Sequence, residues 1–121
     1  MNLVKIKVIL KDEDSTVSNI EVNGYHHEEK QIITYIDRDE KKTHTEFHYG
    51  RNELIRDNEE MYLVLSFSLD KNSKGKLIEK QTNKELLLNI RTRKIEQNNN
   101  FIFIEYELED KLYTLEMKME E

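Results

Sequence analysis

The chain of 121 residues is long enough to bury a hydrophobic core, and we expect one domain over residues 1–121. Its 25 acidic and 19 basic residues are mixed along the chain, with a net charge of −6, which argues against the basic stripe of a nucleic-acid-binding protein. It contains no cysteine, and no apolar run approaches the ~20 residues of a membrane span. We therefore expect a cytoplasmic protein that binds neither nucleic acid nor membranes.

The first half of the chain is a series of short segments in which apolar and polar residues alternate. Such an alternation, with a period of two residues, is typical of a strand with one face in a core and the other in water. The first segment alternates from its start, so no signal peptide is expected. Asn23-Gly24 predicts either a hairpin turn or a bulge in a strand that continues through Tyr25. Strands are predicted at 3–10, 17–22, 31–37, 43–49, 53–56 and 61–69, with a turn at 38–42.

A further strand is predicted at 76–81, and residues 86–119 then read as a meander of three antiparallel strands. The apolar residues of neighbouring strands must fall on one face, so the number of residues in each connection is constrained. In the first hairpin the connection must contain an odd number of residues, and this parity predicts a three-residue loop, Asn98–Asn100. Arg91 then lies opposite Glu107, and Arg93 opposite Glu105.

The second hairpin of the meander needs an even loop, which predicts a turn at Asp110-Lys111. In that register Leu108 faces Tyr113, and Glu105 faces Glu116. The same alternation predicts that Leu69 faces inward and that one group of residues is almost fully buried: Leu65, Phe67, Leu88, Ile90, Ile104, Tyr106 and Leu115.

About ten strands at regular spacing, with no amphipathic helix, indicate a sandwich or a barrel. Short hairpins between consecutive strands favour the barrel, which also removes exposed strand edges. We predict an all-β fold: a single antiparallel, mostly up-and-down β-barrel of about 8–10 strands.

Several short motifs of the chain match a family pattern. They are Gly24-Tyr25, Tyr35-Ile36-Asp37, Leu54-Ile55-Arg56, Thr92-Arg93-Lys94-Ile95 and Tyr106. With these the chain resembles the YwiB-like family of small bacterial proteins, from which it departs where Asp37 replaces a Glu and where Asn58 and Lys84 stand near expected glycines. The resemblance implies a calycin-like, lipocalin-type barrel and implies no activity.

Strand parity and the family pattern together predict a polar site inside one end of the barrel. If Ile33 and Leu54 face the lumen, Asp37 and Arg56 also point inward near their strand ends. An inward arginine needs a carboxylate, so the two should form an ion pair. We expect Tyr35, Thr92 and Tyr106 to line the same interior. The pair is either a clasp that closes the barrel or an anchor for the head group of a ligand.

His44, Glu46 and His48 share one face of a predicted strand, which is a partial metal-ligand set. His26 or His27 could complete it, whereas the alternative is an ordinary polar outer face. No nucleophile motif or phosphate-binding loop is present.

The predicted function is a non-catalytic barrel that either binds a small, largely apolar ligand or, if its lumen is filled, contacts another protein. No cofactor is expected. The alternative is a metal-dependent enzyme or metal-binding barrel that uses His44, Glu46 and His48.

Overall fold

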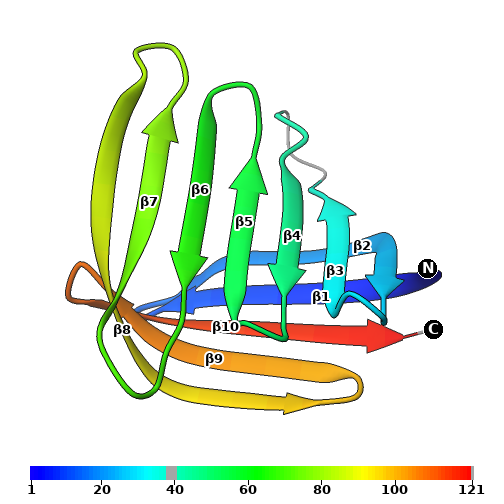
Figure 1. Ribbon diagram of the computed structural model, residues 1–121. Coiled ribbons are helices and arrows are strands. Elements are labelled where there is room, and N and C mark those ends of the chain that lie inside the picture. Colours follow the sequence, from blue (N-terminus) through cyan, green and yellow to red (C-terminus); the bar gives the residue numbers. More distant parts are fainter. Residues whose placement is uncertain (38–40, 121) are drawn as a thin grey trace.

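The computed structural model describes residues 1–37 and 41–120 and consists of ten antiparallel strands closed into one barrel (Figure 1). Each strand pairs with the next along the chain, and β1 pairs with β10 to close the ring. The predicted all-β, up-and-down barrel is therefore confirmed. No helix in these two ranges is long and apolar enough to cross a membrane. The strands are β1 (Asn2–Asp12), β2 (Thr16–His27), β3 (Ile32–Ile36), β4 (His44–His48), β5 (Glu53–Asp57), β6 (Met61–Ser66), β7 (Ser73–Glu79), β8 (Lys84–Asn98), β9 (Phe101–Leu108) and β10 (Lys111–Glu120).

The strands form two layers that cross at a large angle in Figure 1. The shorter strands β3 to β7 stand upright, and β1, β2, β9 and β10 run across them. β8 bends and belongs to both layers, because its first part pairs with β7 and its second part with β9. The ladder between β8 and β9 shifts register between Thr92 and Lys94, so Arg93 is an extra residue on β8. Such a bulge bends a strand and turns the corner of a barrel.

The bulge also corrects the predicted first hairpin. Arg91 does lie opposite Glu107, but Lys94 takes the position opposite Glu105 that was predicted for Arg93. The connection has two residues, Asn99 and Asn100, because Asn98 still pairs with Phe101. The odd residue that the parity demands lies in the strand and not in the loop. The predicted three-residue loop is therefore wrong, although the predicted faces of the strands are right.

The second hairpin is displaced by one residue from the predicted turn. Glu109 and Asp110 form the turn, with φ values of 48° and 67°. Tyr113 consequently lies opposite Tyr106 and not Leu108, and Thr114 lies opposite Glu105. The register moves by two residues, which keeps every side chain on its predicted face and avoids the predicted contact between two glutamates.

The barrel interior is filled by hydrophobic side chains from all parts of the chain. Six of the seven residues predicted to be buried are buried, and Leu88 is only half-buried. Leu69, predicted to face inward, is exposed because β6 ends at Ser66. The core consists of Val4, Ile6, Val8, Val22, Ile33, Tyr35, Phe47, Leu54, Leu65, Phe67, Ile90, Ile102, Ile104, Tyr106, Leu115, Met117 and Met119.

Gly24 lies inside β2, which continues through Tyr25, so the predicted hairpin alternative at Asn23-Gly24 is wrong. The register does not shift at this position, where Gly24 lies between Val4 and Tyr35. A Cβ atom here would be 2.4 Å from the carbonyl oxygen of Thr34. The glycine is thus required by close packing. The turn predicted at 38–42 falls largely outside the described residues.

Candidate functional site

Asp37 and Arg56 form the predicted ion pair at one end of the barrel, which we name the Arg56 end. Asp37 directly follows β3, and Arg56 lies on β5, so the pair spans the intervening strand β4. Arg56 Nη2 donates a hydrogen bond to Asp37 Oδ2, and Thr45 of β4 donates from Oγ1 to Asp37 Oδ1 over 3.4 Å. The side chains are 30% and 13% exposed, so the pair is partly desolvated. Arg56 thus bonds to Asp37 through Nη2 while part of its side chain remains open to solvent.

Two buried tyrosines lie on the lumen side of this pair. Burial raises the pKa of the Tyr35 phenol; the Asp37 charge raises it further, and the Arg56 charge opposes this effect. Burial, and to a smaller extent the neighbouring Tyr113, also raise the pKa of Tyr106. The charge of Arg56 lowers it. Both phenols therefore stay protonated and uncharged at neutral pH. The ring of Tyr106 stacks on Tyr113 with centroids 5.6 Å apart.

Thr92, predicted to line the interior with Tyr35 and Tyr106, is buried, and its hydroxyl group bonds to the backbone. Thr92 lies opposite Tyr106 in the ladder, and its Oγ1 accepts a hydrogen bond of 3.1 Å from the backbone N–H of Ser68. It therefore holds the segment that follows β6. The structure brings Tyr35, Asp37, Arg56 and Tyr106 together, and gives Thr92 a separate role. Ligand binding by any of these residues remains a prediction.

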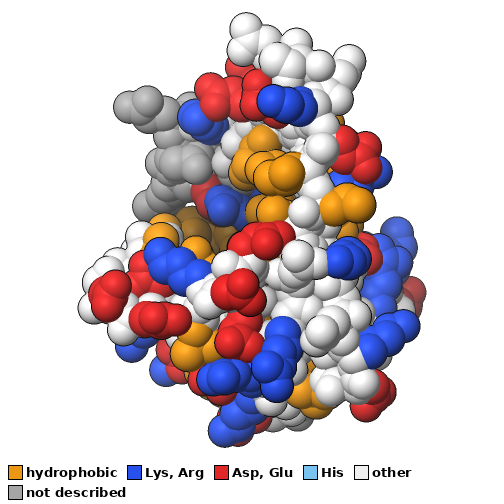
Figure 2. Space-filling view, turned by 90° about the vertical axis from the view of Figure 1, so that its left-hand side faces the viewer, with side chains coloured by type: hydrophobic (Ala, Val, Ile, Leu, Met, Phe, Trp, Pro, Cys, Tyr) orange, Lys and Arg blue, Asp and Glu red, His pale blue; other side chains and the backbone are white. Residues whose placement is uncertain are grey.

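A groove of about 860 Å³ opens at the Arg56 end. Arg56 and Thr43 lie on one side of it, and Met61 and Leu77 supply apolar surface. Its charged lining is balanced between three basic residues and three acidic ones: Lys41, Arg56 and Lys80, and Glu59, Glu60 and Glu79. Figure 2 views the molecule from the β7–β8 side and shows hydrophobic side chains lying open among acidic and basic ones.

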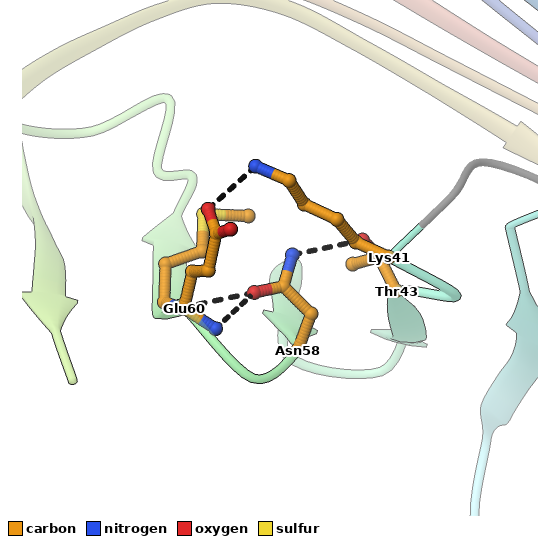
Figure 3. Close-up of polar contacts among 5 residues, drawn as sticks. Lys41, Thr43, Asn58 and Glu60 are labelled. Atoms are coloured by element: carbon orange, nitrogen blue, oxygen red, sulfur yellow. Dashed lines mark hydrogen bonds and ion pairs between the residues drawn. The ribbon is translucent and has the colours of Figure 1, made fainter. Parts of the chain in front are cut away.

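The wall of this groove is braced by Asn58, which the sequence analysis did not identify as a site residue (Figure 3). Asn58 Nδ2 donates to Thr43 Oγ1 over 3.0 Å, and its Oδ1 accepts from the backbone N–H groups of Glu60 and Met61. Lys41 Nζ contacts Glu60 Oε2 at 2.5 Å. These bonds tie the residues before β4 to the turn between β5 and β6. The signal in the sequence is an asparagine at the start of a turn, whose side chain bonds to the following backbone.

The opposite end of the barrel, which we name the His26 end, has its own polar pair. His26 Nε2 and Tyr49 Oη are hydrogen-bonded at 2.8 Å, and His26 is 9% exposed. Burial, and to a smaller extent the charge of Glu28, raise the pKa of Tyr49. Gln97 Nε2 donates to the carbonyl oxygen of Tyr49 over 3.2 Å. A groove of about 890 Å³ opens here beside these residues.

The alternative of a metal site is not supported by the geometry. His44, Glu46 and His48 do lie on the outer face of β4, and His48 Nε2 is 3.7 Å from Glu46 Oε1. His26 bonds to Tyr49, and His27 Nε2 lies 3.4 Å from Thr34 Oγ1. Within residues 1–37 and 41–120, no group of three or more histidine, aspartate or glutamate side chains could hold a metal ion.

Comparison with known proteins identifies a structural match. The match is the crystal structure of the ywiB protein from Bacillus subtilis, with a TM-score of 0.68 and 16% sequence identity over 98% of this chain and 89% of that chain. The chain has a YwiB-like fold. The resemblance seen in the short sequence motifs is therefore supported at the level of the fold. No family model and no curated protein matches the sequence.

Proposed function

We propose that this protein is a non-catalytic binding barrel that holds a small molecule in the groove at the Arg56 end. The observation that carries the proposal is the position of Arg56. It lines an open groove, and its side chain is 30% exposed beside a partly buried carboxylate. Arginine offers several N–H donors in a planar fork, and only part of that capacity is used by Asp37. The remaining donors favour a ligand with an acceptor group.

The charges around the groove favour a neutral or zwitterionic ligand. The three basic and three acidic lining residues balance, and Asp37 partly neutralises Arg56. An anion would gain from Arg56 but would be repelled by Asp37, whereas an amide or an α-amino acid head group offers both an acceptor and a donor. Met61 and Leu77 provide contact surface for an apolar part of the ligand.

A filled lumen is the condition under which the sequence predicts contact with another protein, and it is compatible with a small molecule only at the barrel end, where the groove lies. Large aliphatic and aromatic side chains occupy the interior, including Phe47, Ile33, Ile104 and Met117, which are fully buried. A fully enclosed apolar ligand would have to displace them, whereas the groove of about 860 Å³ is within the usual size range for small-molecule sites. We further propose that the protein is of the calycin type and resides in the cytoplasm, in keeping with its cysteine-free sequence.

The proposal can be tested with four probes that share a six-carbon chain: hexanamide, norleucine, hexanoate and hexylamine. Binding is measured by NMR from the backbone N–H signals of Glu60 and Met61, which line the groove and are present in every variant. We expect saturable shifts with hexanamide or norleucine, and weaker binding of the singly charged probes. Arg56→Met should abolish binding, and Asp37→Asn should strengthen binding of hexanoate because it removes the repelling charge.

The matched control is Arg91→Met, because the Arg91 side chain is 70% exposed and lies outside the groove. This variant should bind the probes like the parent protein. If none of the four probes gives a saturable shift, or if Arg56→Met binds them unchanged, the proposed ligand site is wrong. The ion pair would then act only as a clasp between β3 and β5.

A further inference from the structure

The barrel leaves part of β8 without a neighbour on one side. β9 ends at Leu108, which pairs with Ile90, and residues 84–88 pair only with β7. Figure 1 shows this first part of β8 rising beside β7, with no strand on its other side. Within the described residues, no backbone partner lies along this edge beyond Asn89, whose carbonyl oxygen accepts from the N–H of Glu109 over 3.0 Å.

The direction of the unpaired backbone groups follows from Asn89. Its N–H also bonds away from β7, to Glu109 Oε1 over 2.8 Å. Successive residues of an antiparallel strand direct their N–H and C=O groups to opposite sides. The backbone groups of Leu87 and Glu85 therefore point to the open edge, whereas those of Leu86 and Leu88 point to β7. This edge offers two residues with free donors and acceptors, a ready template for another strand.

Three of the five side chains of this edge, at residues 84–88, are leucines, which distinguishes it from a second open edge on β2. Leu86 is 56% exposed on the inner face and Leu87 is 63% exposed on the outer face. β2 pairs with β3 only from Gly24 to His27, so residues 16–23 are also open on that side. Its side chains include Ser18, Asn19, Glu21 and Asn23, the polar and charged types that discourage strand addition. The β8 edge lacks this protection at three successive leucines.

We infer that residues 84–88 form a self-association site, at which a second copy of the chain adds its own residues 84–88 as an antiparallel strand. In a symmetric antiparallel pair, directly opposed residues of the two copies point to the same face of the sheet. Only registers that oppose two inner-face residues or two outer-face residues of β8 are therefore allowed. Placing Glu85 opposite its own copy would bring two carboxylates together. Placing Leu87 opposite its own copy would direct Glu85 to Asn89, whose backbone groups are already used.

The remaining register is self-complementary. Leu86 lies opposite Leu86 of the second copy, and Glu85 lies opposite Leu87 in both directions. Each Glu85–Leu87 pair exchanges two backbone hydrogen bonds, and the central leucines form the close, non-hydrogen-bonded pair. On the inner face, the Leu77–Leu86 pair of one copy continues into that of the other. Each Glu85 already has a cationic partner in its own chain, because Lys76 Nζ lies 3.3 Å from Glu85 Oε1.

A single cysteine tests this register directly, because the chain has none of its own. Opposed Cα atoms at a non-hydrogen-bonded position lie about 4.5 Å apart, within the range that a disulfide spans. Leu86→Cys should therefore form a covalent dimer under mild oxidation at least about tenfold faster than Leu87→Cys or Leu3→Cys, through its higher effective concentration. Leu87 is on the same edge, and Leu3 is 64% exposed on β1.

Sedimentation velocity of the unmodified protein supplies the second measurement. We expect a reversible dimer with a dissociation constant of about 10⁻⁵–10⁻⁴ M, as suits a small interface. Glu85→Pro should be monomeric and remain folded, because it removes an N–H that points to the open edge and not to β7. Equal cross-linking rates of the three cysteine variants, a monomer at about 1 mM protein, or a persistent dimer of Glu85→Pro would each overturn the inference.

Discussion

Each end of the barrel is closed by a polar pair that spans one intervening strand, but the two pairs differ in chemistry. At the Arg56 end, Arg56 of β5 meets Asp37 after β3, across β4. At the His26 end, His26 of β2 meets Tyr49 after β4, across β3. Each pair thus fastens three neighbouring strands. The first uses opposite charges that are partly removed from water, whereas the second uses a ring nitrogen and a phenol. We learn that one end has a fixed polar anchor, and that the other end can close without a permanent ion pair.

The largest effect should come from the core that joins the two ends. Ile104 is fully buried, so Ile104→Ala should lower the free energy of unfolding by about 2–5 kcal/mol. Both ends should unfold in the same transition when followed in urea by tyrosine fluorescence. Leu88→Ala is the control, and should cost less because Leu88 is only half-buried where it packs against the core. Equal losses for both variants would contradict this difference in packing.

Alkaline pH should weaken the Arg56 end through its buried tyrosines. The folded protein raises the pKa of Tyr35 and Tyr106 above the unfolded value near 10, so their contribution is fully present below pH 10 and is lost as pH rises through the folded pKa. At pH 11 the loss should be about 1.4 kcal/mol for each tyrosine. Urea unfolding at pH 9, 10 and 11 measures it, and the Tyr35→Phe and Tyr106→Phe double variant should lose much less. A double variant with the parent's pH dependence would contradict the assignment.

Removing the charge at the Arg56 end should have an intermediate effect on stability. Arg56→Met leaves Asp37, whose side chain is 13% exposed, without its guanidinium partner and should cost about 1–3 kcal/mol. Adding Asp37→Asn should recover part of this loss because it removes the carboxylate charge. Thermal and urea unfolding of the two variants provide the measurement. If Arg56→Met unfolds like the parent protein, the pair contributes nothing to closure of this end.

The smallest of these effects is expected at the His26 end. Tyr49→Phe removes one hydrogen bond to His26 and keeps the ring, so the cost should be about 0.5–1.5 kcal/mol. The NMR signals of the His26 ring should shift in this variant, while the signals of Tyr35 and Tyr106 stay in place. Shifts at Tyr35 would show that the two ends are coupled more closely than their separate contacts indicate.

Strand parity predicted the sheet faces and, together with the family pattern, the Asp37–Arg56 contact. Alternation along 31–37 and 53–56 places both residues on the inner face, and a desolvated arginine needs a carboxylate. The contact depends only on local periodicity and on the order of neighbouring strands, which short hairpins imply. For the same reason the registers that proved wrong still left side chains on their predicted faces.

Features that depend on distant parts of the chain could not be predicted in this way. Leu86 and Leu88 alternate like core residues, but parity does not say that β9 ends before it reaches them. The extra residue Arg93 lies in a bulge, although an asparagine loop could equally have held the odd residue. The sequence makes His26 a candidate metal ligand, whereas its bond to Tyr49 across β3 has no local signal.

The closure between β1 and β10 makes the order of strands circular. Lys5 lies opposite Glu120, and the two ends of the described chain lie on the same side of the barrel in Figure 1. A short linker could therefore join them, and new ends could be introduced between Asn99 and Asn100 without breaking any ladder. In such a circular permutant the contact between β1 and β10 would change from the most distant pairing in the sequence to a local hairpin. The pairing between β8 and β9 would in turn become the most distant one, because a closed ring of strands always leaves one such closure, so the permuted chain should fold at about the same rate as the parent protein.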